Sequence, residues 1–285
     1  MKVADTTRRA LRLIEKHHRE KDLFAGGFNV YSQLSGWCET ALAFLGEFEE
    51  ARAVLDKGLA NAFEIDDRWG VGWMEWSYIS VSIYKGDGEN LIDHARKAIE
   101  CFEETGIEIC LGLAWSGLGM GYSLLGDYET ARHHAEKGLQ LQRETGVPVL
   151  LPMAYTVLAM IHSDARDVEK ARECAEEALK LSREFKTALL EADALMVLGS
   201  AMGVADPENI AAAVQHIQQG LAMVEERKLR TLYAAGRLFL GELFVGRGLR
   251  KEALENLTQA ESMWKEMGAT GYWLTRTQEA MARLA

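Results

Sequence analysis

A buried-type residue, small in most cases, recurs about every 40 residues along nearly the whole chain. Apolar or small residues return four and seven positions after each of these sites, as they would along one face of a helix. A fixed period of this length is typical of stacked repeats, in which each unit buries its apolar face only against its neighbours. The recurring positions are Ala51, Leu91, Ala131, Ala171, Ala213 and Ala253.

One unit stands out clearly between residues 111 and 146. An apolar stretch rich in small residues runs from Leu113 to Leu125 and ends at Gly126, which suits the left-handed turn at a helix end. Asp127 then begins a second helical stretch as its N-cap. Each unit is therefore predicted to be a hairpin of two helices, A and B, and the period predicts six hairpins. The turn glycine returns at Gly46, Gly86 and Gly248, and Arg166 replaces it once.

Outside the repeats, residues 4–19 are expected to form a leading helix and residues 270–284 a trailing one. The predicted division of this single domain is a leading segment over 1–24, six repeats over 25–268 and a C-terminal cap over 269–285. A slip of two residues before Ala213 is placed in the turn Asp206-Pro207-Glu208. The trailing helix carries one face that would cover the last hairpin: Trp273, Thr277, Ala280 and Leu284.

Charge and cysteine content narrow the class of partner. The net charge is −11, which argues against nucleic acid because phosphate binding needs a basic face. The first 22 residues are locally basic, but acidic residues interrupt them, so a solvated face is expected there. The four cysteines show no C-x-x-C spacing and indicate neither a disulfide framework nor a zinc site. We find no apolar run long enough to span a membrane, and we expect a cytoplasmic protein.

Catalytic and cofactor motifs are also missing from the pattern, so neither an enzyme nor a cofactor is predicted. The run Gly117-Leu118-Gly119-Met120-Gly121 superficially suggests a phosphate-binding loop, but no strand precedes it and helix packing already explains it. A stripe at one phase of the B helices suggests a metal site, yet neighbouring helices lie too far apart to share an ion easily. We therefore expect no metal. The stripe consists of Val54, His94, His134, Cys174, His216 and Asn256.

The internal spacing of the units resembles the tetratricopeptide repeat, and the likeness covers roughly residues 30–268. The unit is longer than the usual 34 residues, and Glu39 and Ile79 stand where the family has a small residue. The signature is carried by Trp115, Leu118, Gly119, Tyr122, Gly126, Tyr128 and Ala131, and again by Leu240, Gly241, Phe244, Gly248 and Ala253. Partial matches occur at Leu198-Gly199 and at Tyr155, Leu158 and Ala159.

A narrower likeness lies in the C-terminal third, which is similar to the repeat regions of large bacterial signalling proteins. Those proteins join such regions to class III cyclase or signalling-ATPase modules, and no such module is present in this sequence. The stretches concerned are Asp206-Pro207-Glu208, Arg230-Thr231-Leu232 and Met267-Gly268 with Trp273-Leu274.

The resemblance implies an all-α fold, a right-handed α-solenoid whose A helices line a concave groove. The groove positions most suited to a partner are Phe44, Trp73, Trp76, Tyr84, Met120, Met153, Met160, Met196, Leu238 and Glu242. Further positions at the same phase are Ser80, Ile83, Leu113, Ser116, Ser123, Leu124, Thr156, Ser163, Asp164, Asp193 and Ser200. Aromatic and thioether side chains favour an apolar, helical ligand, although residues with this spacing also serve as core.

Three functions follow as hypotheses. The leading one is a non-catalytic scaffold that binds a peptide or helix of a partner protein in bacterial signalling. The second is a regulatory sensor that binds a small apolar molecule or a signalling peptide. The third is a structural element that self-associates.

Overall fold

The computed structural model describes residues 2–24, 27–206 and 210–284, and this part of the chain is helical. A leading helix, α1, spans Lys2–Lys16, and a trailing helix, α14, spans Tyr272–Ala282. The A helices between them are α2 (Val30–Leu45), α4 (Arg68–Lys85), α6 (Glu108–Leu124), α8 (Leu151–Asp164), α10 (Ala188–Ala205) and α12 (Arg230–Gly246). The B helices are α3 (Phe48–Glu64), α5 (Gly88–Thr105), α7 (Tyr128–Glu144), α9 (Val168–Glu184), α11 (Ala211–Glu226) and α13 (Arg250–Met267), and a short 3-10 turn, η1 (Pro148–Leu150), precedes α8.

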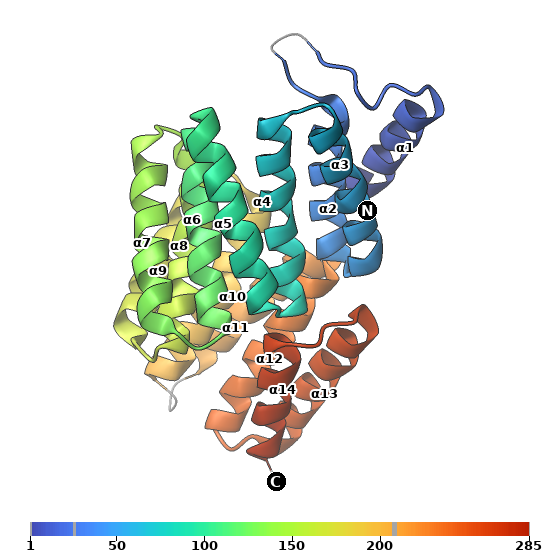
Figure 1. Cartoon of the computed structure of the whole chain (residues 1–285). Coiled ribbons are helices and arrows are strands. Elements are labelled where there is room, and N and C mark those ends of the chain that lie inside the picture. The colour runs from blue at the N-terminus through green and yellow to red at the C-terminus, as the bar shows by residue number, and fades with distance from the viewer. Residues whose placement is uncertain (1, 25–26, 207–209, 285) are drawn as a thin grey trace.

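These helices form the predicted α-solenoid of six hairpins. Each A helix packs against the B helix of its own hairpin and against the helix that comes before it in the chain. Successive A helices also touch each other (Figure 1). No strand is assigned in the described residues, where the only β-type pairing is an isolated bridge between Leu23 and Asn29. The predicted turn at Asp206-Pro207-Glu208 lies outside the described residues beyond Asp206.

The recurring small positions form the seam inside each hairpin. Ala51, Leu91, Ala131, Ala171 and Ala253 have no exposed surface, and Ala213 has 1%. The turn residues also behave as predicted, because Gly46, Gly86, Gly126 and Gly248 all have positive φ angles. Arg166 takes the same left-handed conformation with φ 63°, as expected of the residue that replaces glycine there.

The glycine run of the third hairpin is explained by packing on three sides of α6. A side chain on Gly117 would meet Ile79, one on Gly119 would meet Ala131 and Ala135, and one on Gly121 would meet Leu91 and Ile92. Gly117 thus makes room for the large Ile79 that replaces a small residue of the family pattern.

The two ends of the solenoid touch each other. The hydroxyl of Thr231 on α12 donates a hydrogen bond to the carbonyl of Phe44 on α2 (3.3 Å). The indole of Trp273 on α14 donates to the carbonyl of Ile83 on α4 (2.7 Å). Figure 1 shows α12, α13 and α14 lying below the first two hairpins. The superhelix is therefore closed on itself, whereas the sequence suggested a long open inner surface.

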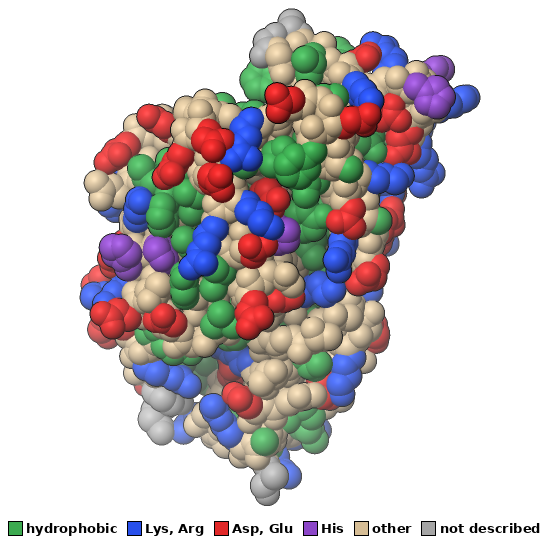
Figure 2. Space-filling model, viewed as in Figure 1, with side chains coloured by type: hydrophobic (Ala, Val, Ile, Leu, Met, Phe, Trp, Pro, Cys, Tyr) green, Lys and Arg blue, Asp and Glu red, His purple; other side chains and the backbone are tan. Residues whose placement is uncertain are grey.

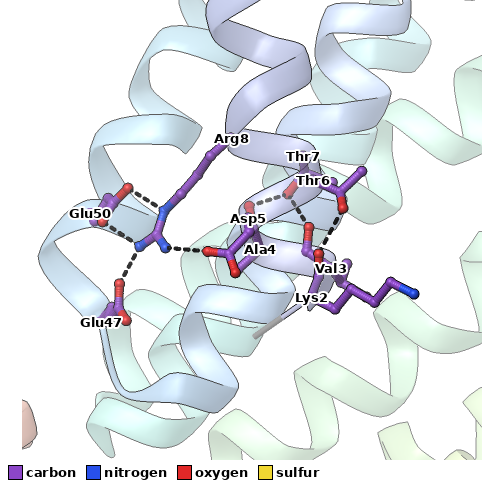
Figure 3. Close-up of polar contacts among 9 residues, drawn as sticks. All are labelled: Lys2, Val3, Ala4, Asp5, Thr6, Thr7, Arg8, Glu47 and Glu50. Atoms are coloured by element: carbon purple, nitrogen blue, oxygen red, sulfur yellow. Dashed lines mark hydrogen bonds and ion pairs between the residues drawn. The ribbon is translucent and has the colours of Figure 1, made fainter.

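The leading helix is fastened to the first hairpin by an ionic contact (Figure 3). Arg8 donates to both oxygens of Glu50 (2.7 and 2.6 Å) and also pairs with Glu47. Ala4, Thr7 and Leu11 form the buried face of α1. Part of the basic N-terminal stretch thus serves an internal contact.

One expectation about apolar runs is corrected. Among the described residues a single helix, α10, has the length and composition that a membrane span needs, with a mean hydropathy of 1.5. Of this window 56% is buried, because α10 lies in the stack between α8 and α12 and packs against α9 and α11. Helix α10 is apolar because it is a core helix of the solenoid.

Candidate functional site

A cavity of about 850 Å³ opens at the C-terminal ends of four consecutive A helices. The last turns of α6, α8, α10 and α12 supply one part of its wall, and α14 supplies the other. Six positions predicted at the groove phase line it: Ser123, Leu124, Ser163, Asp164, Ser200 and Glu242.

The centre of the cavity wall is ionic. Arg276 on α14 donates to both carboxylate oxygens of Glu242 (2.7 and 2.8 Å) and to one oxygen of Asp164 (3.0 Å). Tyr272 donates its hydroxyl proton to the other oxygen of Asp164 (2.7 Å) and accepts from Arg276 (2.5 Å). These four side chains, which we call the Arg276 cluster, join α8, α12 and α14.

Burial and charge act against each other in the Arg276 cluster. Burial raises the pKa of Asp164, and the neighbouring Arg276 only partly offsets this. Burial by itself lowers the pKa of Arg276, but Glu242, Tyr272 and Asp164 more than compensate, so its pKa lies well above the usual range. Arg276 is therefore cationic at every physiological pH. The cluster is a fixed polar feature of the cavity.

The rest of the wall combines charged groups with apolar side chains, among them Leu125, Val204 and Leu243. Arg166, Arg283 and Glu279 add charged groups, and Tyr128 adds a phenol. The last turns of helices present carbonyl acceptors and the negative end of the helix dipole. A peptide, which carries backbone amides together with charged and apolar side chains, can find a partner for each of these groups in such a wall.

Aromatic residues predicted for the groove gather elsewhere, along α2 and α4. The rings of Phe44 and Tyr84 lie 5.5 Å apart, and Trp73 and Trp76 stack at 5.0 Å. Trp73 is 8% exposed, and the other three are partly buried. None of the four lines the cavity. The structure therefore groups these aromatics into two pairs along α2 and α4, and neither pair belongs to the cavity wall.

The predicted aliphatic and thioether positions divide between core and surface. Met196 and Leu238 have no exposed surface and Met120 has 2%, so these three are core residues and offer nothing to a partner. Met196, for example, packs against Gly220 of α11 and Gly236 of α12, so neighbouring helices of the stack cover it. Met153 and Met160 remain partly exposed, and neither lines the cavity.

Two carboxylates, Glu39 and Asp193, form no ion pair with the residues that the structure describes. Glu39 is fully buried; its Oε2 accepts a hydrogen bond from the Thr40 hydroxyl (3.1 Å), and its Oε1 has no partner among the described residues. Burial raises the pKa of Glu39 far above its usual value and that of Asp193 to about 6. Tyr84 lies near both, since their charges contribute to raising its pKa.

The histidine stripe of the B helices is distributed over separate contacts. His94 pairs with Glu75 (2.6 Å) and stacks on Tyr78, whereas His134 packs against Trp115 and Tyr122. In the part of the chain that the structure describes, no group of three or more His, Cys, Asp or Glu side chains is arranged to hold a metal ion.

Sequence reasoning missed the contribution of α14 to the site. The predicted face of this helix is buried, with Trp273, Thr277 and Ala280 at 2% exposed or less. Its other face, with Tyr272 and Arg276, reaches into the cavity. The available signal was the helical spacing of Tyr272 and Arg276, but nothing in the sequence links them to Asp164, 112 residues away.

A family model described as tetratricopeptide repeat matches residues 154–185, which cover most of α8 and α9. This match identifies residues 154–185 as one unit of the tetratricopeptide repeat type. No curated protein matches the chain.

Solved structures share this tetratricopeptide repeat fold. A Signal Transduction ATPase with Numerous Domains (STAND) from Pyrococcus horikoshii, which has a tetratricopeptide repeat sensor, is 20% identical with a TM-score of 0.54. The match covers 91% of this chain but only 39% of that protein. A Rap protein complexed with Competence and Sporulation Factor is 16% identical with a TM-score of 0.59, covering 93% and 76% of the two chains.

Aspartyl phosphate phosphatase F from Bacillus subtilis is 14% identical with a TM-score of 0.55, and the match covers 89% of this chain and 70% of that one. At these identities the likeness shows the fold alone.

Proposed function

We propose that this chain is a non-catalytic scaffold that binds a peptide segment of a partner in its inner cavity, within a cytoplasmic signalling assembly of a bacterial cell. The observation that carries the proposal is the 850 Å³ cavity with the Arg276 cluster in its wall. A space of this size takes several residues of a peptide, and the mixed charges provide partners for its amides and side chains.

The structural neighbours support this reading. The Rap protein was solved in complex with Competence and Sporulation Factor, and the STAND protein carries its repeats as a sensor. The phosphatase name of a third neighbour carries no activity over, because a fold hosts many functions. The cavity wall places charged groups beside apolar side chains, and this mixture suits a peptide better than a purely apolar molecule.

The test compares two tryptophan variants on the same helix. Thr275→Trp would place a large ring at the cavity, whereas Gln278→Trp adds the same ring at an exposed position of α14 outside it. Each protein is used to capture partners from its native cells, with quantitative mass spectrometry and a thermal melt as the fold control. We expect T275W to lose partners that wild type and Q278W retain. Retention of every partner by a folded T275W would reject the cavity as the site.

Contacts between the two ends of the solenoid favour a sensor as the second candidate. The cavity is bounded by Gly86 after α4 and by Gly271 and Tyr272 before and in α14, where the ends meet. A ligand there would contact both sides of the closure and shift its equilibrium. Hydrogen exchange at residues 83–86 and 270–273 with the captured peptide would measure this. If hydrogen exchange at these residues does not change when the protein is saturated with the peptide, the sensor hypothesis is rejected and the scaffold hypothesis stands.

A further inference from the structure

The outward face of α1 is the strongest feature that the cavity does not use. Val3 and Leu13 are 57% and 59% exposed, and Thr6 and Ala10 lie between them at helical spacing. Arg9, Arg12 and Lys16 run along one side of this apolar seam and line the same open depression as Thr6, Ala10 and Leu13. We call these seven residues the α1 face.

Helix α1 occupies the position of a B helix in the stack, but it has no A helix of its own among the described residues. In each complete hairpin a B helix packs against its own A helix and against the next A helix along the chain. Helix α1 packs on α2 as α3 packs on α4, with Ala4, Thr7 and Leu11 buried. Among the described residues no helix occupies the place of its own A helix. The α1 face is therefore the surface that, in the other hairpins, packs against an A helix.

The charges on the α1 face indicate what kind of partner helix could bind there. Other cations near α1 are used internally, since Arg8 pairs with Glu47 and Glu50 (Figure 3) and Lys57 pairs with Glu15. Arg9, Arg12 and Lys16 form no ion pair with the described residues, and of the three only Arg12 also lines the neighbouring depression that contains Glu15 and Glu50. In a chain of net charge −11, where Figure 2 shows acidic and basic side chains interspersed over one face, three such cations beside one seam are complementary to an acidic partner.

We propose that the α1 face docks an amphipathic helix of a partner protein, with an apolar stripe flanked by acidic residues. The apolar stripe covers Val3, Ala10 and Leu13, and the acidic flank pairs with Arg9, Arg12 and Lys16. The site is independent of the inner cavity. A membrane surface fits less well, because two large apolar side chains give little insertion and an acidic body is repelled by anionic lipid.

The first experiment measures binding of a designed 18-residue helical peptide with a leucine stripe flanked by glutamate, using fluorescence anisotropy on the full chain. A peptide with lysine in place of glutamate serves as the reversed-charge probe. The variants are Arg9→Glu with Arg12→Glu, matched to Arg250→Glu with Lys251→Glu, which changes charge equally at exposed positions of α13. Leu13→Gln tests the seam.

We expect R9E/R12E to weaken binding of the glutamate peptide by about tenfold or more, and R250E/K251E to leave it within about twofold. L13Q should also weaken it, and the lysine peptide should bind poorly to wild type. Equal binding by both double variants, or no binding of the glutamate peptide, would overturn the proposal. Thermal melts confirm that each variant is folded.

Two further measurements distinguish a partner helix from two other possible occupants of the α1 face, a membrane surface and a second copy of the chain. Sedimentation with vesicles of phosphatidylcholine and phosphatidylserine should show no association. Vesicle binding that R9E/R12E abolishes would overturn the proposal in favour of a membrane. Light scattering over a range of concentrations should give a monomer. A dimer lost in R9E/R12E would assign the α1 face to a second copy instead.

Discussion

At the scale of the residue, close approach of backbones decides which positions must stay small. A Cβ atom on Gly119 would lie 2.6 Å from the carbonyl oxygen of Ala131 and 2.9 Å from the Cβ of Ala135. Backbone atoms of a packed helix cannot move aside as the end of a flexible side chain can. Gly246, also helical, has no atom within 4 Å of the corresponding point.

We therefore predict opposite effects for the same substitution at these two positions. Gly119→Ala should destabilise the protein by about 1–3 kcal/mol, because overpacking outweighs the gain in helix propensity. Gly246→Ala should stabilise it by about 0.4–1 kcal/mol through the unfolded chain. Urea unfolding of both variants beside the parent tests this, and a stabilised G119A would contradict the packing account.

Asp193 makes stability depend on pH. Burial raises its pKa to about 6, whereas an unfolded aspartate titrates near 4. The native state thus holds this proton more tightly than the unfolded state. The stabilising effect of protonation is full below about pH 4 and is lost as the pH rises through about 6.

Asp193→Asn should consequently be more stable than the parent at about pH 7, by about 1–3 kcal/mol, and equal to it near pH 4. Unfolding in urea at both pH values measures the difference. Glu136→Gln, at an exposed position of α7, is the control and should change little. A D193N variant that is less stable at neutral pH would show that the carboxylate has a stabilising partner.

At the scale of the element, α14 does more than cover the last hairpin. Trp273 stacks on Trp264 at 5.5 Å and donates to the carbonyl of Ile83, so one side chain joins the last hairpin to the second. Arg276 joins the same helix to α8 and α12. This helix therefore holds both the closure of the solenoid and the wall of the cavity.

Removing the Trp273 ring should cost far more than removing an exposed one. Trp273→Ala is expected to destabilise the protein by about 3–5 kcal/mol, since it empties a fully packed site. Trp37→Ala, 54% exposed in the parent, should cost below about 1 kcal/mol. The midpoints of urea unfolding of the two variants test this prediction. Similar midpoints would show that α14 does not hold the two ends of the solenoid together.

At the scale of the whole molecule, closure makes the chain compact. Its accessible surface is 13100 Å² for 31.8 kDa, close to the roughly 12,200 Å² of a compact globular monomer of that mass. An open array of six hairpins would expose more. Helix α2 contacts α12 and helix α4 contacts α14, and these contacts bury surface that an open array would leave exposed.

Small-angle X-ray scattering should accordingly give a radius of gyration in the range of about 18–20 Å, around the roughly 19 Å of a compact chain of 285 residues. W273A should give a larger value if it remains folded, because the ends then separate. A parent value well above this range would show that the solenoid is open in solution.

Local periodicity was sufficient to predict the hairpins, their small seam residues and the turn at Arg166, because those features depend on neighbours near in sequence. The same periodicity could not tell groove from core at Met196 and Leu238, since both surfaces of an A helix are apolar. It also could not pair Arg276 with Asp164. Contacts between distant repeats form only because the superhelix curves back on itself. Its curvature is the sum of small rotations between successive repeats, and no single sequence position encodes that sum.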